Sequence, residues 1–259
     1  MTDSATPNST TSDPVATAPA EPKPDHRSMR IVAVNAGVSD PSSTRLLADR
    51  LTQRALERLR SAGLRAEATI IDLAPLAVDI ARAGVSGLTS DSLRAVTAQL
   101  ATADALIAAT PVYKAGISGL FKSFIDILDD DLLIAKPVVV ATTAGSPRHA
   151  LVADGHMRPL FAFMRALTTP TAVSAAPEDW ASPQLGARID RAATELFHLV
   201  RADVADTIAE DAWAGYQHHF GGNATRAQQT PDDVDFDTDL MRLAAGGSLP
   251  PRRSRPRDA

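Results

Sequence analysis

MRIVAVNAG, residues 29–37, and SSTRLLADRLTQRALERLRSAG, residues 42–63, are the two segments that decide the fold of this chain. The first is an apolar run rich in β-branched residues. It is too short for a helix and ends at Gly37, so it predicts a buried strand. The second opens with hydroxyl residues suited to capping, carries leucines at helical spacing and stops at Gly63, so it predicts a helix. A strand followed directly by a helix is the repeating unit of parallel sheets.

The same alternation continues along the chain. Further strands are predicted at 66–73, 104–111, 136–145 and 169–175. Helices are predicted at 90–103, 119–130, within 154–167 and as one long helix over 182–213, and residues 74–90 are weakly patterned. Five strand–helix units with continuously apolar strands predict an α/β fold. We expect a flavodoxin-like three-layer sandwich around a five-stranded parallel sheet of order 2-1-3-4-5.

Both ends of the chain differ in composition from this central part. Residues 1–28 hold five prolines and nine serines or threonines, with no Leu, Ile, Phe, Tyr or Trp. Such a segment buries too little apolar surface to offset the entropy of ordering it, so we predict a disordered N-terminal tail. Residues 218–259, with an acidic run and the basic end PRRSRPRDA, predict a second, largely disordered tail. One domain remains, at 29–217.

Composition narrows the function classes. The 259 residues include no cysteine, which excludes disulfides, cysteine nucleophiles and thiolate metal sites. The net charge of −5 gives no reason to expect nucleic acid. No stretch approaches the ~20 apolar residues of a membrane span, and the N-terminus has no signal-peptide core, so we expect a cytoplasmic protein. The pair His218–His219 has no third ligand near it in a predicted element, so no metal site is expected.

In an open parallel sheet, ligands bind beyond the carboxyl ends of the strands, where the strand order reverses. For the order expected here, that point lies between the first and third strands. Three loops then face the same site, at 37–45, 110–116 and 143–149. The strand order alone predicts that these loops meet.

The first loop, GVSDPSSTR at 37–45, precedes a helix N-terminus, where backbone N–H groups and hydroxyls can wrap a phosphate. Its candidate binding residues are Ser39, Ser42, Ser43, Thr44 and Arg45. A simpler interpretation is that Ser42 or Ser43 only caps the helix and that Arg45 points to solvent. The loop is neither a G-x-G-x-x-G nor a Walker sequence.

The second loop is TPVYKAGISG at 110–119, where the proline enforces an extended backbone that can offer N–H groups to the edge of a flat ring. Its candidates are Pro111, Val112, Tyr113, Lys114 and Gly116. The alternative is a plain strand–helix connection.

The third loop is TTAGSPRHAL at 142–151, again after a strand. Its candidates are Thr143, Ala144, Gly145, Ser146 and His149. The alternative is that His149 has a structural role and does not contact a ligand.

The three loops together resemble the NADPH-dependent FMN reductase family, and most closely the flavin reductases of two-component monooxygenases. The block TPVYKAGISGLFKSFIDIL, residues 110–128, is similar to that family's flavin-ring loop, with Pro111, Tyr113, Gly119, Lys122 and Asp126 in register. The resemblance covers about 30–200. It departs from the family at Val38, where a hydroxyl residue is usual, and at Ile117, where the alkanesulfonate type carries an aromatic residue.

The resemblance implies reduction of FMN by NADPH or NADH, with hydride transfer to the flavin N5. Such a transfer needs no protein acid or base, so no catalytic side chain is expected. It also implies a homodimer or homotetramer that supplies reduced flavin to a partner, with a luciferase-like flavin monooxygenase as the narrower expectation.

Three other interpretations stay open. One is an enzyme that keeps FMN bound and reduces a quinone or azo compound. Another is a non-enzymatic, flavodoxin-like electron carrier, although this chain lacks the T-x-T-G-N-T phosphate loop and acidic surface usual for flavodoxins. The last is a flavin-binding regulator without turnover.

Overall fold

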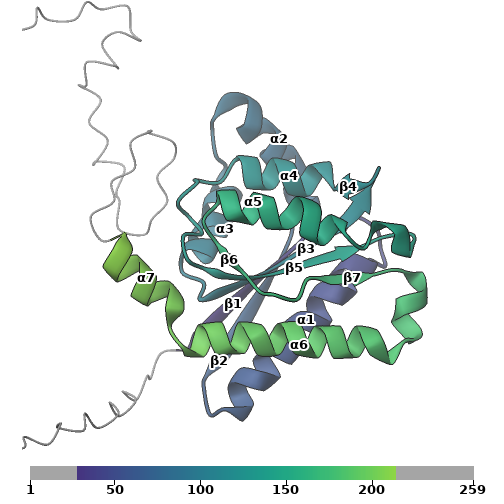
Figure 1. The fold of residues 1–259 in the computed structure, drawn as a ribbon. Coiled ribbons are helices and arrows are strands. Elements are labelled where there is room, and N and C mark those ends of the chain that lie inside the picture. Colours follow the sequence, from purple (N-terminus) through teal and green to yellow (C-terminus); the bar gives the residue numbers. More distant parts are fainter. Residues whose placement is uncertain (1–27, 214–259) are drawn as a thin grey trace, which may run out of the picture.

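The structure of the protein is a computed structural model that describes residues 28–213. The two predicted tails, at 1–28 and 218–259, lie outside the described residues except for Ser28, and they stay predictions. The described part is an α/β sandwich with a twisted sheet between two helical layers, as Figure 1 shows. The fold class expected from the sequence is therefore confirmed.

The sheet has the predicted parallel arrangement. Its parallel strands are β1 (Met29–Asn35), β2 (Ala66–Asp72), β3 (Ala105–Tyr113), β5 (Pro137–Thr143), β6 (Leu167–Thr168) and β7 (Val173–Ala175), and β4 (Gly116–Ile117) is antiparallel. The order is β2-β1-β3-β5-β6, with β7 also paired to β5 and β4 paired to β3. This is the expected order 2-1-3-4-5, with β5 as the fourth strand and β6 and β7 sharing the fifth position.

The sheet differs from the prediction in having seven strands instead of five. The fifth strand is interrupted between β6 and β7. Pro170 has no N–H to donate to a neighbouring strand. The N–H of Thr171 donates to Glu195 Oε2 at 2.7 Å instead of to β5. The backbone thus leaves the sheet for a few residues and returns at Val173.

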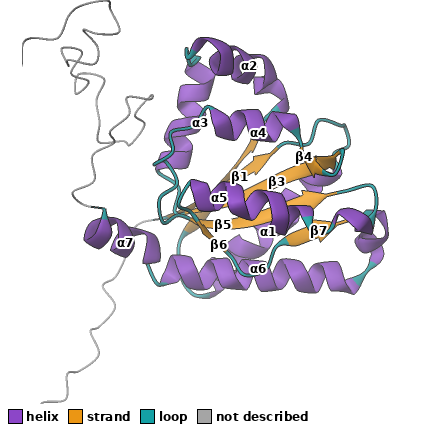
Figure 2. Cartoon of the chain, turned by 45° about the horizontal axis from the view of Figure 1, so that its top comes forward, coloured by secondary structure: helices purple, strands orange, loops and turns teal. Residues whose placement is uncertain are grey.

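Helices cover both faces of the sheet (Figures 1 and 2). One face carries α1 (Ser43–Ser61) and α6 (Pro183–Arg201), and the other carries α2 (Ala77–Ser86), α3 (Asp91–Ala101), α4 (Gly119–Asp126) and α5 (Arg158–Phe163). Short 3-10 turns lie at Ala74–Leu76, Pro147–His149 and Pro177–Ala181, and a π-helical turn at Ala153–Met157 leads into α5.

Helix α1 shows how the sequence produces this packing. The Ser42 hydroxyl caps it by accepting from the N–H of Arg45 at 3.2 Å. Leu47, Leu51 and Leu59 return to one face and are almost fully buried between the sheet and α6. The capping residue predicted from the sequence therefore fixes where the helix begins, directly beyond the first loop.

Two helical predictions need correction. The single helix expected at 182–213 is two helices, α6 and α7 (Val204–Ala212), because Asp203 adopts a left-handed conformation with φ 51°. Asp tolerates that region better than most residues, so neither glycine nor proline marks the break. The weakly patterned segment 74–90 contains α2, which ends at Gly87 with φ 70°.

Within residues 28–213, no helix is both long and apolar enough to cross a membrane.

Candidate functional site

The three predicted loops follow strands that are neighbours in the sheet. β3 pairs in parallel with β1 on one side and with β5 on the other. Their carboxyl ends therefore reach the same edge of the sheet, and the register places Pro111 beside Thr143. The structure thus brings the loops at 37–45, 110–116 and 143–149 together.

A buried hydrogen bond ties the first loop to the third. The hydroxyls of Thr44 and Thr143 lie 2.6 Å apart, and both residues are almost completely buried. The sequence identified both as candidate binding residues. In the structure their hydroxyls bind each other, so these side chains join the first loop to the third.

The first loop is packed tightly around Gly37. A Cβ at this position would lie 2.1 Å from Ser42 Oγ and 3.0 Å from Thr44 Cβ, closer than atoms can approach without displacement. The N–H of Gly37 donates to Asn35 Oδ1 at 2.9 Å, which fixes the turn out of β1. A side chain at this position would displace the Ser42 hydroxyl from its capping position at the start of α1.

The rim of this loop fits an anion. Ser39 and Ser43 are exposed, and among the described residues neither side chain has a hydrogen-bond partner. The first turn of α1 carries no acidic side chain, and helix N-termini present unpaired N–H groups and partial positive charge. These features match what a phosphate needs, with Val38 exposed beside them and offering no hydroxyl.

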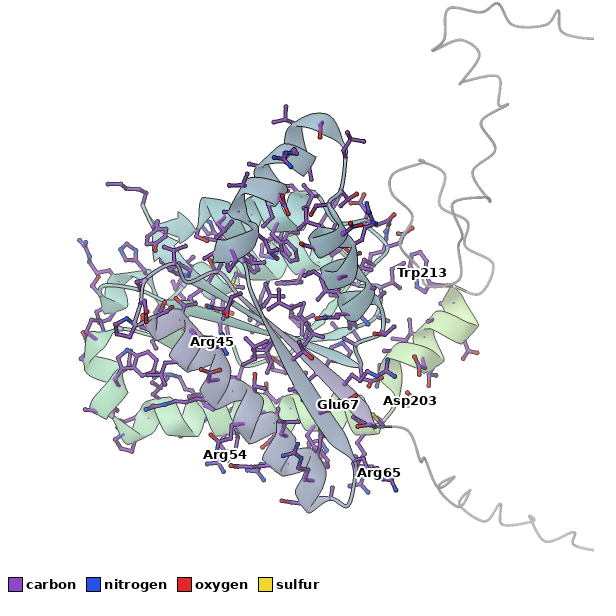
Figure 3. The ribbon with its side chains drawn as sticks, turned by 180° about the vertical axis from the view of Figure 1, so that it is seen from behind. Arg45, Arg54, Arg65, Glu67, Asp203 and Trp213 are labelled. Carbon is purple, nitrogen blue, oxygen red and sulfur yellow. The ribbon has the colours of Figure 1, made fainter. Side chains whose placement is uncertain are left out.

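Arg45 is engaged with carboxylates on its own side of the sheet. Its guanidinium donates to Asp49 Oδ1 at 3.0 Å and to Asp72, which also accepts from Asn35. The bond to Asp49 raises the pKa of Arg45 above its ordinary value, burial lowers it, and the bond to Asp72 raises it again. Figure 3 shows Arg45 on α1. Its charge is therefore shared with two carboxylates rather than held free for a phosphate.

The second loop is a tight β-hairpin between β3 and β4. Lys114 and Ala115, at its tip, both have left-handed backbones, with φ 51° and 62°. Two consecutive positive φ values are what a two-residue type I′ turn requires, usually with glycine or asparagine. Tyr113 is 51% exposed at the end of β3, and Val112 is partly buried below it. The hairpin therefore projects beyond the sheet edge.

Polar contacts hold the base of this hairpin. The hydroxyl of Thr110 accepts from the N–H of Ser118 at 3.2 Å and lies 3.1 Å from the Ser118 hydroxyl. Ser118 Oγ in turn accepts from the N–H of Phe121 and so caps α4. The strand end, the hairpin and the next helix are thus one connected unit.

The third loop has a divided role. Ala144 donates its N–H to Ala175 at 3.0 Å, so this group is used within the sheet and is unavailable to a ligand. Gly145 is exposed, and Ser146 and His149 are partly buried around the short turn Pro147–His149. Only their position at this loop therefore supports Gly145, Ser146 and His149 as ligand contacts.

His156 is a residue near the site that sequence reasoning missed. It lies on the π-helical turn Ala153–Met157, and its imidazole lies beside Gly116, with Cε1 and Nδ1 both 3.7 Å from where a Cβ on that glycine would stand. A π-turn inserts a residue into a helix and rotates the side chains that follow it. No pattern in the sequence predicts this turn.

A cavity of about 570 Å³ lies elsewhere, at the opposite edge of the sheet, between the start of β1, the start of β5 and α7. It includes none of the loop residues, so topology rather than cavity size identifies the site. Among the described residues, no group of three or more His, Asp or Glu side chains could hold a metal ion. The pair His218–His219 lies outside the described residues.

Comparison with known proteins agrees with this geometry. Residues 29–181 match the model of the family described as NADPH-dependent FMN reductase. An FMN reductase (NADPH) from Pseudomonas aeruginosa is 36% identical over 169 residues, covering 63% of this chain and 88% of that protein. An NADH-dependent FMN reductase, SfnF, from Pseudomonas fluorescens is 41% identical over 163 residues, covering 61% of this chain and 82% of that protein.

Solved structures show the same fold. An oxidoreductase from Corynebacterium diphtheriae is 40% identical, with a TM-score of 0.66, and the match covers 68% of this chain and 98% of that one. An NADH:FMN oxidoreductase, EmoB, in its apo form is 24% identical, with a TM-score of 0.58, over 68% of this chain and 90% of that one. At that identity, EmoB supports the fold alone.

Proposed function

This chain belongs to the NADPH-dependent FMN reductase family, and we propose that it binds FMN at the three-loop edge and supplies reduced FMN to a separate monooxygenase. It is an oxidoreductase that uses FMN and NAD(P)H, as the family match and the named relatives indicate. The assignment of residues to the site, the release of the flavin and the partner are the parts that we propose.

The observation that carries the proposal is the position of the block 110–128. Its Pro-Val-Tyr segment forms the end of β3, where Tyr113 is exposed, its Gly-Ile pair forms β4, and its helix starts at the Ser118 cap. This hairpin lies at the strand-order reversal, where open α/β sheets bind their ligands. The block 110–128, which carries the family resemblance, therefore lies at the sheet edge where we propose that FMN binds.

We assign the phosphate to the first loop and the flavin ring to the second and third. Ser39, Ser42 and Ser43 surround the N-terminus of α1, which favours an anion. Backbone groups of the hairpin would then lie along the ring edge, with the exposed Tyr113 beside it. When bound, FMN supplies N5 as the acceptor of a hydride from nicotinamide C4.

The protein's own contribution is positioning. Hydride transfer between two bound rings needs them close and aligned, and it needs no side chain to gain or lose a proton. The rigid parts of the site meet that need. The Thr44–Thr143 bond ties two loops together, and the Thr110–Ser118 contacts fix the hairpin on α4.

An exposed hairpin favours release of the flavin over permanent retention. The tip residues Lys114 and Ala115 and the ring of Tyr113 are all exposed, so little of this loop is available to enclose a ring within one chain. This distinguishes the proposal from an FMN-retaining quinone or azo reductase, the second enzyme interpretation.

Equilibrium dialysis of the purified protein tests release directly. We expect FMN to leave during dialysis, and initial rates to saturate with both added FMN and NAD(P)H. A protein that keeps stoichiometric FMN through dialysis, and whose rate does not respond to added FMN, would support the retaining reductase instead.

We also propose a homodimer or homotetramer. Val78, Val85 and Leu88 form an exposed apolar stripe along and just beyond α2, with Val85 92% exposed. Light scattering at several protein concentrations would show the assembly, and a monomeric mass throughout would contradict it.

A further inference from the structure

We infer that His156 is a binding residue of the proposed site, whose imidazole donates a hydrogen bond to a planar amide carbonyl of the bound rings. This inference rests on the proposed function. Such a carbonyl occurs both on the pyrimidine edge of the flavin and in the carboxamide of the nicotinamide, so the chemistry is shared by the two substrates.

The imidazole of His156 lies beside the second loop. Its Cε1–Nδ1 edge faces Gly116, which forms the return strand of the hairpin that we assign to the ring. Cε1 and Nδ1 both lie 3.7 Å from where a Cβ at Gly116 would stand, so the imidazole lies beside this strand. A ring lying along the backbone of this hairpin would therefore come within reach of His156.

The imidazole is accessible to a ligand. His156 is exposed, and within residues 28–213 its nitrogens have no hydrogen-bond partner. With Nδ1 and Cε1 turned toward Gly116, Nε2 is the ring nitrogen that remains free to meet a ligand. A neutral imidazole carries one N–H and one acceptor nitrogen, so it can satisfy a carbonyl without a change of charge.

Hydrogen bonds from Arg158 hold the turn around His156 firmly. Arg158, two residues later, donates to Asp154 Oδ1 at 2.6 Å, to Thr168 Oγ1 at 3.1 Å and to the carbonyl of Thr169 at 2.6 Å. It also reaches the carbonyl of Pro170. The π-turn is thereby fixed to the sheet edge, and the histidine is presented from a rigid element.

π-Turns are frequently found at functional sites, because the extra residue redirects one side chain out of the helical pattern. Here the redirected segment carries an unpaired histidine against a loop of the family motif. The neighbouring Met157 is completely buried, so the turn is anchored in the core by Met157, while His156, the residue before it, is exposed.

Two substitutions test the inference. His156→Ala removes the donor, and His156→Gln keeps an N–H close to the position of Nε2. Loss of one hydrogen bond corresponds to about a fivefold change in affinity. We expect His156→Ala to raise either the dissociation constant of FMN or the KM for NADPH about fivefold, with kcat much less affected and with substantial rescue by His156→Gln.

The two measurements separate the two carbonyl sources. A fluorescence titration with FMN alone measures the affinity for FMN and so detects a hydrogen bond to the flavin carbonyl. The KM for NADPH at saturating FMN detects a hydrogen bond to the nicotinamide carboxamide. His198→Ala is the matched control, because His198 is exposed on α6 near the opposite edge of the sheet. Melting temperatures of all variants identify any general loss of folding.

If the wild type is active, and if the FMN dissociation constant and the KM for NADPH of His156→Ala both lie within twofold of the wild-type values, the role of His156 is overturned. The proposed function then remains intact. A wild type that neither binds FMN nor oxidises NAD(P)H in its presence would overturn both. If His156→Ala fails to fold, His156→Leu, which fills the space without an N–H, takes its place, and constants within twofold of the wild-type values would equally contradict the inference.

Discussion

The hydroxyl of Thr44, at the start of α1, lies 2.6 Å from the hydroxyl of Thr143, at the end of β5, across 99 positions of sequence. Both groups are buried, so the bond is shielded from water. It makes the relative position of the first and third loops a property of the core, and a site assembled from both loops depends on it.

Replacing Thr44 with Val should therefore destabilise the protein. The substitution keeps the shape but leaves the Thr143 hydroxyl buried without its partner, at a cost of about 1–2 kcal/mol. The double variant Thr44→Val/Thr143→Val should cost less than the sum of the two single changes. Urea unfolding measures all three. Thr52→Val is the control, because Thr52 is buried on the same helix and its hydroxyl has no partner among the described residues, so removing that hydroxyl should not destabilise the protein. Strictly additive costs would contradict the coupling.

Ala115→Gly should raise stability. Ala115 has φ 62°, a region that costs an L-residue about 1 kcal/mol and that glycine enters freely. The same change at Ala150, which is also exposed but has φ −56°, should lower stability because it only adds freedom to the unfolded chain. Thermal melts of both variants measure the two changes in Tm. Equal losses of Tm at the two positions would show that the turn is not strained at Ala115.

Gly37→Ala should weaken FMN binding at least tenfold. The added methyl group would meet Ser42 Oγ at 2.1 Å, so the hydroxyl that caps α1 must leave its position or the loop must move. Gly186→Ala, within α6, meets no atom within 4 Å and should instead stabilise the helix by about 0.5–1 kcal/mol. FMN titration of both variants gives the comparison. Unchanged affinity in a folded Gly37→Ala protein would remove the first loop from the site.

Asp179 should contribute stability that depends on pH. A hydrogen bond from the N–H of Ala176, and then the side chain of Arg188, hold the pKa of this carboxyl below its ordinary value. A depressed folded pKa means that the contribution is fully present above the unfolded pKa and is lost as pH falls through the folded one.

Asp179→Asn should thus cost about 1 kcal/mol at pH 7, and the difference from wild type should shrink below about pH 4. Melting curves from pH 7 to pH 3 would show this. Glu178→Gln is the control, since the exposed Glu178 makes no side-chain hydrogen bond within the described region. A constant difference between Asp179→Asn and wild type across that range would contradict the linkage.

Local patterns predicted most of the fold. The apolar run at 29–37 and the capped helix after Ser42 are confirmed as β1 and α1. The helix α2 was missed because its apolar pattern is weak, although Pro75 before it and Gly87 after it are start and stop signals. The break at Asp203 has no such signal.

The site was predictable to the level of its loops. Strand order determines that the three loops meet, and composition shows which could hold a phosphate. The direction of each side chain depends on tertiary contacts. Thr44 is bonded to Thr143, Arg45 is paired with Asp49 and Asp72, and a π-turn brings His156 to Gly116. None of these relationships is local in sequence except the pair Arg45–Asp49.

The central claim is that this protein reduces FMN with a nicotinamide nucleotide at the three-loop edge. The most direct test follows the nicotinamide absorbance band of NADPH, and separately of NADH, after adding FMN to wild type and to Tyr113→Ala. We predict oxidation by wild type that saturates with added FMN, and a raised KM for FMN in the Tyr113 variant. No oxidation above the enzyme-free rate with either nucleotide would contradict the activity, and an unchanged KM for FMN in the variant would contradict the site.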